Sequence, residues 1–415
     1  MTDLSHRSVS FASYNRAAAL DLIRRSGPLT RRELADALGL SRAGIATVVD
    51  QLVMSGAAVE EQGERTKGGP GRPPRLITLV EVGGASVLAL IVRPRRVEAA
   101  LVSSGGEVTA SRSAEMPLSS DASASARELI ALAKAVTAGV EPGPSAAALV
   151  LPTLVHDGGR IDHHGARELM PTWLDEDVVL SLELELGLSV DVVNETVAAA
   201  VGEAALAGTG VERCAIYVKV GASGTGMCTL VGGVPFGGAS GIAGQLGHIS
   251  IRGQGVRCPC GQRGCIAAEI DYQVREELER RRGHLTRFSV EDLVREAKDG
   301  EPATRRFFYD IGIQLAPALG AAINLLQPST VVIGGDLADG DTGLLAGLEG
   351  ELSLSVHPGI AEGLQVSVSR FGSISTAVGA ASLIGDRARS QGQRMPVPLT
   401  PHPAGAPTAT IVSPR

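Results

Sequence analysis

From about residue 85 onward, apolar strand-like runs alternate with helical patterns, and this alternation constrains the fold more than any other feature. Strands interleaved with helices indicate an α/β architecture. The pattern occurs in two successive sets, which predicts two lobes with a cleft between them. The predicted elements are a hairpin at 87–108, a helix at 127–140, a strand at 146–152, a helix at 178–187, a strand at 190–194, a helix at 196–208, a hairpin at 214–233, a helix from Leu293, a helix at 311–328 and a strand at 330–335.

The segment before this alternation predicts three short helices. A first helix is expected from Tyr14 to Arg25. Thr30 and Glu33 have the spacing of a capping box, which begins the second helix. Gly39 allows a tight turn, after which a third helix follows, and together these elements form a helix-turn-helix pattern. The third helix has a cap at Ser41 and an apolar face made of Ile45, Val48, Val49 and Leu52.

Residues 57–79 predict two strands joined by a basic tip, which is the wing of a winged helix. Taken alone, the Gly/Pro/Arg-rich tip is typical of a solvated linker, but its position directly after three helices favours DNA contact. On the third helix, Arg42 is the best donor to a guanine. The candidate DNA contacts are Thr30, Arg31, Arg32, Ser41, Arg42, Ala43, Gly44, Thr47, Lys67, Arg72 and Arg75.

Charge and composition agree with this division. Residues 1–80 have a net charge of +3 and the rest of the chain has −10, so the basic end is the candidate for a polyanion partner. A chain of 415 residues with 44% hydrophobic residues can form two or three packed domains. Apolar runs long enough for a signal peptide or a membrane span are lacking, so we expect a cytoplasmic protein without membrane contact. The expected domains are a flexible N-terminus at 1–12, a winged helix at 13–80, a two-lobed domain at 85–388 with its boundary near 193–210, and a disordered, proline-rich tail at 389–415.

The stretch GHISIRGQGVRCPCGQRGC, residues 247–265, contains three of the five cysteines. One imidazole and three thiolates are the donor set of a structural, tetrahedral Zn²⁺ site, and glycines at 255, 261 and 264 would let the loop fold around an ion. The alternatives are a disulfide, which a Cys-X-Cys pair closes only with strain, and buried free cysteines. We favour zinc held by His248, Cys258, Cys260 and Cys265, and we expect Cys214 and Cys228 to be core residues.

The order of these motifs resembles the ROK family, whose name joins repressors, open reading frames and sugar kinases. The resemblance runs from about residue 14 to 388 and rests on the helix-turn-helix followed by GGPGRPPR, VVNETVAAAVGE, GIAGQLGH, CPCGQRGC and VVIGGDL. It implies a winged helix followed by a two-lobed, actin-like fold with a duplicated ribonuclease H-like lobe. It also matches His248 and the three cysteines to the zinc ligands of the family.

Two departures from the kinases of this family argue against phosphoryl transfer. Their first hairpin carries Asp-X-Gly-X-Thr, because glycine admits the ATP phosphates and a carboxylate manages magnesium, whereas residues 91–95 here read IVRPR. The kinases have Asn-Asp where this chain has Asn194-Glu195, and the longer Glu195 would displace a catalytic base. The second phosphate loop survives only in part, at 224–228. The resemblance therefore predicts a kinase-like domain that is not an enzyme.

The sugar pocket is altered as well. Hexose-binding members have glutamates three residues before the zinc-bound histidine and two after the last cysteine, and here these positions are Gln245 and Ala267. Glu269 lies further along a probable helix, where it would point elsewhere. The expected effector contacts are Asn194, Glu195, Gln245 and His248, for a sugar or for a sugar phosphate attracted by Arg93, Arg95 or Arg96.

These patterns lead to one favoured function and two alternatives. The favoured one is a DNA-binding transcriptional regulator, expected to be a repressor, that binds a palindromic operator as a homodimer or homotetramer and senses an effector with its kinase-like domain. The first alternative is an ATP-dependent sugar kinase that retains a DNA-binding head. The second is a regulator without a small-molecule effector.

Overall fold

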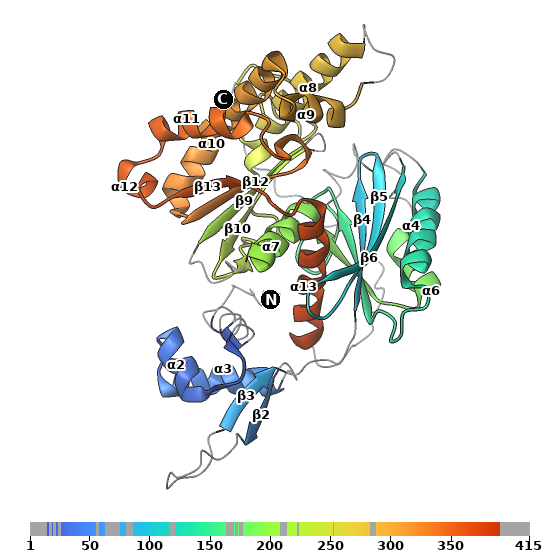
Figure 1. Cartoon of the computed structure of the whole chain (residues 1–415), viewed down its shortest axis with the longest axis vertical. Helices are drawn as coiled ribbons and strands as arrows, with labels where there is room; N and C mark the ends of the chain where they lie inside the picture. Colours follow the sequence, from blue (N-terminus) through green and yellow to red (C-terminus); the bar gives the residue numbers. More distant parts are fainter. Residues whose placement is uncertain are drawn as a thin grey trace, which may run out of the picture.

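The computed structural model describes residues 26–54, 58–62, 75–79, 86–116, 121–162, 177–207, 214–221, 224–251, 253–282 and 288–390, together with Asn15, Ala19, Leu22, Ile23, Met170 and Trp173. The described part contains one small three-stranded sheet near the N-terminus and two five-stranded sheets further on. Figure 1 shows the two larger sheets on either side of a pair of central helices, with the small sheet below them.

The first lobe is built on a sheet with the strand order β6-β5-β4-β7-β8. Alternate residues of its central strand face opposite sides. Leu88 and Leu90 lie in a cluster with α4 and α6, whereas Ala89 and Ile91 lie in a cluster with α13, so both faces are covered. The elements of this lobe are β4 (Val87–Arg93), β5 (Arg96–Val102), β6 (Val108–Glu115), α4 (Ala122–Thr137), β7 (Ala146–Leu151), α6 (Val178–Leu186) and β8 (Val190–Asn194), and α13 spans Ser373–Ser390.

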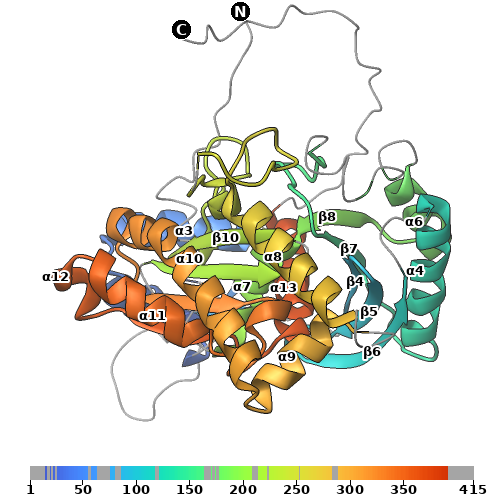
Figure 2. The ribbon, with the colours of Figure 1, turned by 90° about the horizontal axis from the view of Figure 1, so that it is seen from above.

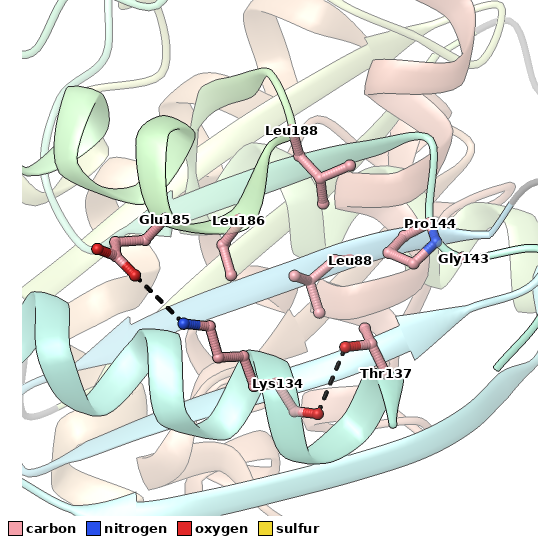
Figure 3. A pocket seen from close by; sticks show the side chains of 8 residues that line it. All are labelled: Leu88, Lys134, Thr137, Gly143, Pro144, Glu185, Leu186 and Leu188. Carbon is pink, nitrogen blue, oxygen red and sulfur yellow. Dashed lines mark hydrogen bonds and ion pairs between the residues drawn. The ribbon is translucent and has the colours of Figure 1, made fainter. Parts of the chain in front are cut away.

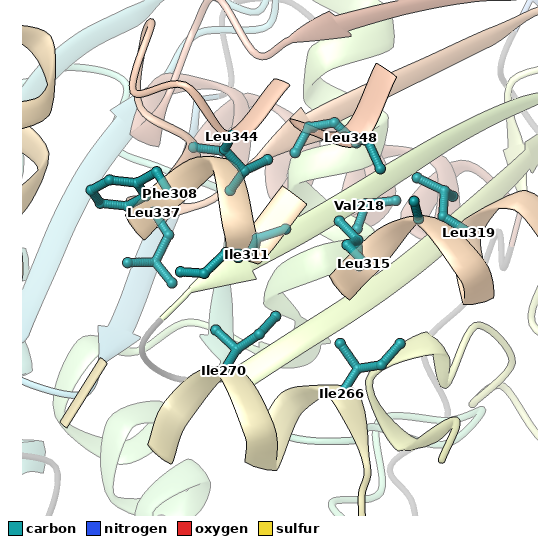
Figure 4. Close-up of a cluster of buried hydrophobic side chains, with 14 of the residues drawn as sticks. Val218, Ile266, Ile270, Phe308, Ile311, Leu315, Leu319, Leu337, Leu344 and Leu348 are labelled. Atoms are coloured by element: carbon teal, nitrogen blue, oxygen red, sulfur yellow. The ribbon is translucent and has the colours of Figure 1, made fainter. Parts of the chain in front are cut away.

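The second lobe repeats this plan with the strand order β11-β10-β9-β12-β13. One face of its sheet packs on four helices through a core that includes Val218, Phe308 and Leu315 (Figure 4). Its elements are β9 (Ala215–Gly221), β10 (Gly224–Val231), β11 (Val234–Pro235), the short 3₁₀ helix η2 (Leu246–His248), α8 (Ile266–Arg282), α9 (Val290–Lys298), α10 (Pro302–Leu326), β12 (Thr330–Gly334), the 3₁₀ helix η3 (Asp336–Ala338), α11 (Leu344–Ser355), α12 (Pro358–Ala361) and β13 (Gln365–Val368).

Within the described residues, one helix has the length and apolar composition of a membrane span. This helix is α10, and its apolar residues, among them Phe308, Ile311 and Leu315, are buried in the core of the second lobe. Its apolar character therefore serves the packing of that core.

Two helices, α7 (Glu195–Ala207) and α13, lie between the sheets of the two lobes (Figures 1 and 2). Helix α7 packs Ala199 and Ala200 on the second sheet and Ala198 on α13, which covers the first sheet. The two helices approach so closely that a Cβ at Gly202 would lie 1.7 Å from the Ser375 carbonyl oxygen, and one at Gly379 would lie 1.8 Å from that of Ala198. Glycine is therefore required where the two helices cross.

A further link fixes α7 to the segment that leads into α13. Glu203 of α7 is buried, and its carboxylate accepts hydrogen bonds from the Ser369 hydroxyl at 2.7 Å and from the Arg370 backbone N–H at 3.0 Å. A buried carboxylate is stable only when it is paired in this way. Helix α7 therefore fixes the position at which the chain enters α13.

The N-terminal unit contains β1 (Leu29–Thr30), α2 (Arg31–Leu38), α3 (Arg42–Met54), β2 (Ala58–Gln62) and β3 (Arg75–Leu79). The sheet is antiparallel with the order β1-β3-β2. The predicted capping box is present, because Thr30 accepts from the Glu33 N–H and Glu33 bonds back to the Thr30 N–H. Gly39 ends α2 in the left-handed conformation, at φ 64°. Ile45, Val48, Val49 and Leu52 form a buried core with Ala19 and Ile23, as the helical spacing predicts.

Several expectations fall partly or wholly outside the described residues. Most of the first predicted helix, the tip of the predicted wing at 63–74 and nearly all of the tail predicted at 389–415 belong to this group. Residues 389 and 390, predicted to be disordered, are the end of helix α13. Within the two lobes the predicted hairpins, strands and helices are present, although α4 begins five residues and α10 nine residues earlier than predicted, and β6, α11, α12, β13 and α13 were not predicted. Helix α7 lies within the stretch where the lobe boundary was expected.

The crossing of α7 and α13 gives a direct test of the packing. We expect Gly379→Ala to destabilise the protein by about 3 kcal/mol or more, since overpacking typically costs about 1–3 kcal/mol and here the added methyl meets a backbone that cannot turn aside. Gly363→Ala is the control, because its Cβ meets no atom within 4 Å. Chemical denaturation measures both variants, and equal stability of the two would contradict the close crossing.

Candidate functional site

The carboxyl ends of parallel strands form one edge of the first sheet, and polar residues gather there. β4, β7 and β8 run parallel and end at Arg93, Leu151 and Asn194. Crevices at this edge are where open α/β sheets bind ligands. Glu195, the first residue of α7, follows directly after β8, and Lys219 comes from β9 of the other lobe. The fold thus brings charged side chains of both lobes together at this edge.

Glu195 is buried, with 3% of its surface exposed, and each of its carboxylate oxygens has a cationic partner. Lys219 Nζ lies 2.5 Å from Oε2, and Arg93 Nη1 lies 2.9 Å from Oε1. Burial acts to raise the pKa of Glu195, but the charges of Lys219 and Arg93 outweigh burial and lower it. The carboxylate is therefore ionised and engaged on both sides.

The other expected effector contacts are also bound within the chain. The Asn194 amide donates to the Thr153 carbonyl at 2.7 Å and accepts from the Val197 N–H at 3.1 Å, which caps the start of α7. The Gln245 amide donates to the Ile242 carbonyl at 2.7 Å. Of the four predicted contacts, three thus make intramolecular bonds, and His248 belongs to the metal cluster described below.

The two stretches that the resemblance matches to phosphate loops, at 91–95 and 224–228, make contacts within the chain. Residues 94 and 95 are the turn between β4 and β5, and Arg93 before them turns to Glu195. In the second stretch, Gly226 faces Thr196, whose hydroxyl would lie 2.9 Å from an added Cβ. The glycine there allows α7 and β10 to pack together.

His248, Cys258, Cys260 and Cys265 come together as the sequence predicts, with their ligand atoms all within 4.8 Å of one another. Cys258 Sγ lies 3.6 Å from His248 Nδ1, and Cys260 Sγ lies 3.7 Å from Cys265 Sγ. A disulfide requires about 2.05 Å, so the cysteines are free. Burial and the neighbouring thiols raise the pKa of Cys265 to about 12, so three thiolates can coexist only around a cation. The donors and their spacing fit a bound metal ion.

The loop that holds this cluster depends on a glutamate of α8. The buried Glu269 carboxylate accepts from the Val256 N–H at 2.7 Å, and a Cβ at Gly255 would lie 2.0 Å from the same carboxylate oxygen. Glu269 therefore supports the loop and does not replace the sugar-binding glutamate, in agreement with the prediction that it points elsewhere. Gly261 and Gly264 have positive φ, at 92° and 70°, which explains two of the glycines in the motif.

The N-terminal unit exposes most of the described residues that were singled out for DNA contact. Ser41, Arg42, Ala43 and Thr47 are exposed on α3, and Gly44 is half-buried. The Ser41 hydroxyl accepts from the Gly44 N–H at 3.1 Å and so caps the helix. Thr30 is engaged in its capping box, Arg32 is exposed, and Arg75 lies 3.6 Å from Glu60 at the base of the β2–β3 hairpin. Lys67 and Arg72 lie outside the described residues.

Arg31 is half-buried, and its guanidinium bonds within this unit. Its guanidinium bonds to both oxygens of Glu60 on β2, at 3.0 and 3.1 Å, and to Asp50 of α3 at 2.8 Å. The contacts raise the pKa of Arg31, with Glu60 as the largest cause. Arg31, one of the predicted DNA contacts, therefore joins α2 to β2 and α3.

Lys219 is the functional residue that the sequence analysis missed. It occupies a strand, AIYVKVG, whose other side chains are almost all apolar. A single lysine in such a run indicates a buried partner of opposite charge, because an unpaired buried ammonium is costly. That partner is Glu195, 24 positions earlier in the chain.

Two cavities lie on the outer face of the first lobe, away from these residues. The first, of about 280 Å³, lies between Leu88 of β4, Thr137 of α4 and Leu186 of α6, with the ion pair of Lys134 and Glu185 at its side (Figure 3). The second lies between α4 and α6. Neither is lined by a predicted effector contact.

Comparison with known proteins identifies the family of the two-lobed part of the chain. The model of the ROK family matches residues 96–387. The xylose repressor of Bacillus subtilis (strain 168) is 24% identical over 52% of this chain and 55% of the relative, so the chain spans about half the length of the first relatives it matches. The DNA-binding transcriptional dual regulator NagC of Escherichia coli (strain K12) is 26% identical over 81% of this chain and 83% of the relative.

Solved structures show the same fold. A crystal structure of a ROK family transcriptional regulator, a homologue of the E. coli MLC protein, has a TM-score of 0.66 at 24% identity and covers 92% of this chain and 97% of its own. A ROK family glucokinase from Streptomyces griseus, in complex with glucose and AMPPNP, has a TM-score of 0.60 at 20% identity and covers 72% of this chain and 99% of its own.

The buried ion pairs predict an unusual dependence of stability on pH. Lys219→Met should cost about 1.5–3 kcal/mol at neutral pH, because Glu195 loses one charged hydrogen bond and keeps Arg93 as its partner. With its lowered pKa, Glu195 contributes stability above the ordinary carboxyl pKa and loses it as the pH falls through the folded pKa. The variant lacks one of the two cations that lower the pKa of Glu195, so this pKa should be higher than in the wild type. The loss of stability relative to the wild type should therefore shrink as the pH falls.

The control for this experiment is Lys134→Met, which breaks an exposed ion pair with Glu185 and should cost less than about 1 kcal/mol. Urea unfolding of both variants at pH 7 and pH 4 measures the differences. A deficit for Lys219→Met that is small, or that grows on acidification, would contradict the assignment of an ionised, doubly paired Glu195.

Proposed function

This chain belongs to the ROK family, and on that premise we propose that it is a DNA-binding transcriptional regulator, acting as a repressor, whose kinase-like lobes serve as sensor and assembly platform. One observation carries the proposal: the N-terminal turn of α3 exposes Ser41, Arg42 and Ala43 while the opposite face is buried. Such a helix can enter a major groove. The relatives named xylose repressor and NagC support the same function.

The N-terminal unit has the order of a winged helix, with a helix, a glycine turn, an exposed helix and a hairpin. Arg42 is the residue we assign to a guanine edge, and Arg32 and Arg75, with Lys67 and Arg72 of the hairpin tip, are assigned to phosphates. The regulator binds a palindromic operator as a homodimer or homotetramer, since two such heads related by a twofold axis recognise two half-sites.

The lobes are not proposed to catalyse phosphoryl transfer. A general base needs access to its substrate and a pKa near the working pH. Glu195 is buried, Lys219 and Arg93 each bind one of its oxygens, and their charges lower its pKa. The stretch that would hold ATP phosphates in a kinase supplies Arg93 to this ion pair instead.

We assign the metal of the His248 cluster as a structural Zn²⁺. One imidazole and three thiolates are the soft, four-ligand set that zinc takes, and four protein ligands leave no position for a catalytic water. Because Cys265 directly precedes α8 and His248 ends η2, the ion would join the start of that helix to the turn that carries Gln245.

A sugar or sugar phosphate is the proposed effector, and a regulator without a small-molecule input is the second candidate. The internal bonds of Asn194, Glu195 and Gln245 favour the second candidate. A panel of sugars and sugar phosphates decides between them by thermal shift, since a ligand that binds only the native state must raise the melting temperature.

Footprinting of the DNA that flanks the gene of this protein tests the proposed function. The wild type should protect a palindrome, and Arg42→Ala should weaken binding by about 1–3 kcal/mol through the loss of a base contact. Arg112→Ala, an exposed residue of β6 in the first lobe, should bind as the wild type does. No protection at low salt, or full binding by Arg42→Ala, would overturn the assignment.

Replacement of a metal ligand tests the zinc assignment. Cys260→Ser should lose the ion and lower the melting temperature, because three remaining donors hold zinc far more weakly than four. Cys214→Ser is the control, since Cys214 lies outside the cluster and should leave metal content unchanged. Elemental analysis of both purified variants gives the answer, and full zinc content in Cys260→Ser would refute the ligand set.

A further inference from the structure

Glu195 joins cations that belong to different lobes. Arg93 is the last residue of β4 in the first sheet, and Lys219 lies within β9 of the second sheet. Each takes a separate oxygen of the same carboxylate, at 2.9 and 2.5 Å. The carboxylate thus forms a bridge across the edge where the two sheets face each other.

The bridge is largely buried, so breaking it would be costly. Glu195 and Lys219 are 3% and 8% exposed, so separation of the lobes would leave charged groups without partners in a region from which most water is excluded. A buried charge that loses its partner destabilises a protein much more than a surface charge does. The bridge therefore resists any rearrangement that separates Arg93 from Lys219.

The other interlobe contacts lie apart from this edge. Helices α7 and α13 cross closely at Gly202 and Gly379, and the crossing holds the middle of the interface. Elsewhere between the lobes, the backbone N–H of Asp157 in the first lobe donates to the Ser240 carbonyl of the second, at 3.2 Å. One long backbone bond adds little resistance.

We propose that Arg93, Glu195 and Lys219 form an ionic latch that holds the two lobes in one fixed arrangement without a ligand in the cleft. Glu195, which the resemblance matches to the base of the kinases, here serves with Arg93 and Lys219 to set the angle between the lobes. This inference concerns the lobes alone and stands whether or not the chain binds DNA. A cleft ligand would change the arrangement only by competing for these three side chains.

Distances between the lobes test the latch. Spin labels attached to bio-orthogonal residues in place of Ser111, exposed on β6, and Glu349, exposed on α11, leave every cysteine unchanged. Double electron–electron resonance on the full-length protein should give a single narrow distance distribution for the wild type. Glu195→Gln should lose that narrow peak and give a broader distribution.

A second variant keeps the test decisive if Glu195→Gln unfolds. The combination of Arg93→Met, Glu195→Gln and Lys219→Met removes the three charges of the bridge together, a change that proteins often tolerate. The matched control is Glu185→Gln, which breaks the Lys134 pair within the first lobe and should keep the narrow peak. A wild-type distribution in the neutral triple variant would overturn the latch, whatever the outcome of DNA footprinting.

Discussion

The crossing of α7 and α13 is the constraint on which the rest of the molecule depends. Each lobe covers one face of its sheet with its own helices and uses this shared pair for the other face. Since Gly202 and Gly379 let the two backbones meet, the two sheets lie only two helix layers apart. At that separation a side chain at the start of α7 can contact strands of both lobes, which is what Glu195 does.

The charge network bears on why this kinase-like fold is proposed to be a regulator. The resemblance to kinases matches Glu195 to the position of a catalytic base and Arg93 to a stretch that holds ATP phosphates. In this chain the two side chains form one buried ion pair. Under the proposed function, the same fold would therefore use these positions to join the lobes.

Local patterns in the sequence predicted most elements, and long-range contacts account for what was missed. The capping box at Thr30, the amphipathic α3 and the metal cluster all rest on residues close together in the chain, so their spacing carries the information. Helix α13 went unpredicted because STAVGAAS has no marked apolar stripe, and only its burial between two layers makes it helical. Lys219 was missed because its partner lies in another element, although a lone lysine in an apolar strand indicates such a partner.

Arg31 ties α2, α3 and the β2–β3 hairpin together, since Glu60 and Asp50 belong to the hairpin and to α3. These bonds favour a head whose helix and hairpin move together. Under the proposed function, a signal from the lobes would then reach DNA as a rotation or displacement of the whole head, with the fit of each head to its half-site unchanged. An effector would change the distance between two heads along the double helix, so that operators with different half-site spacing would respond to opposite states of the same protein.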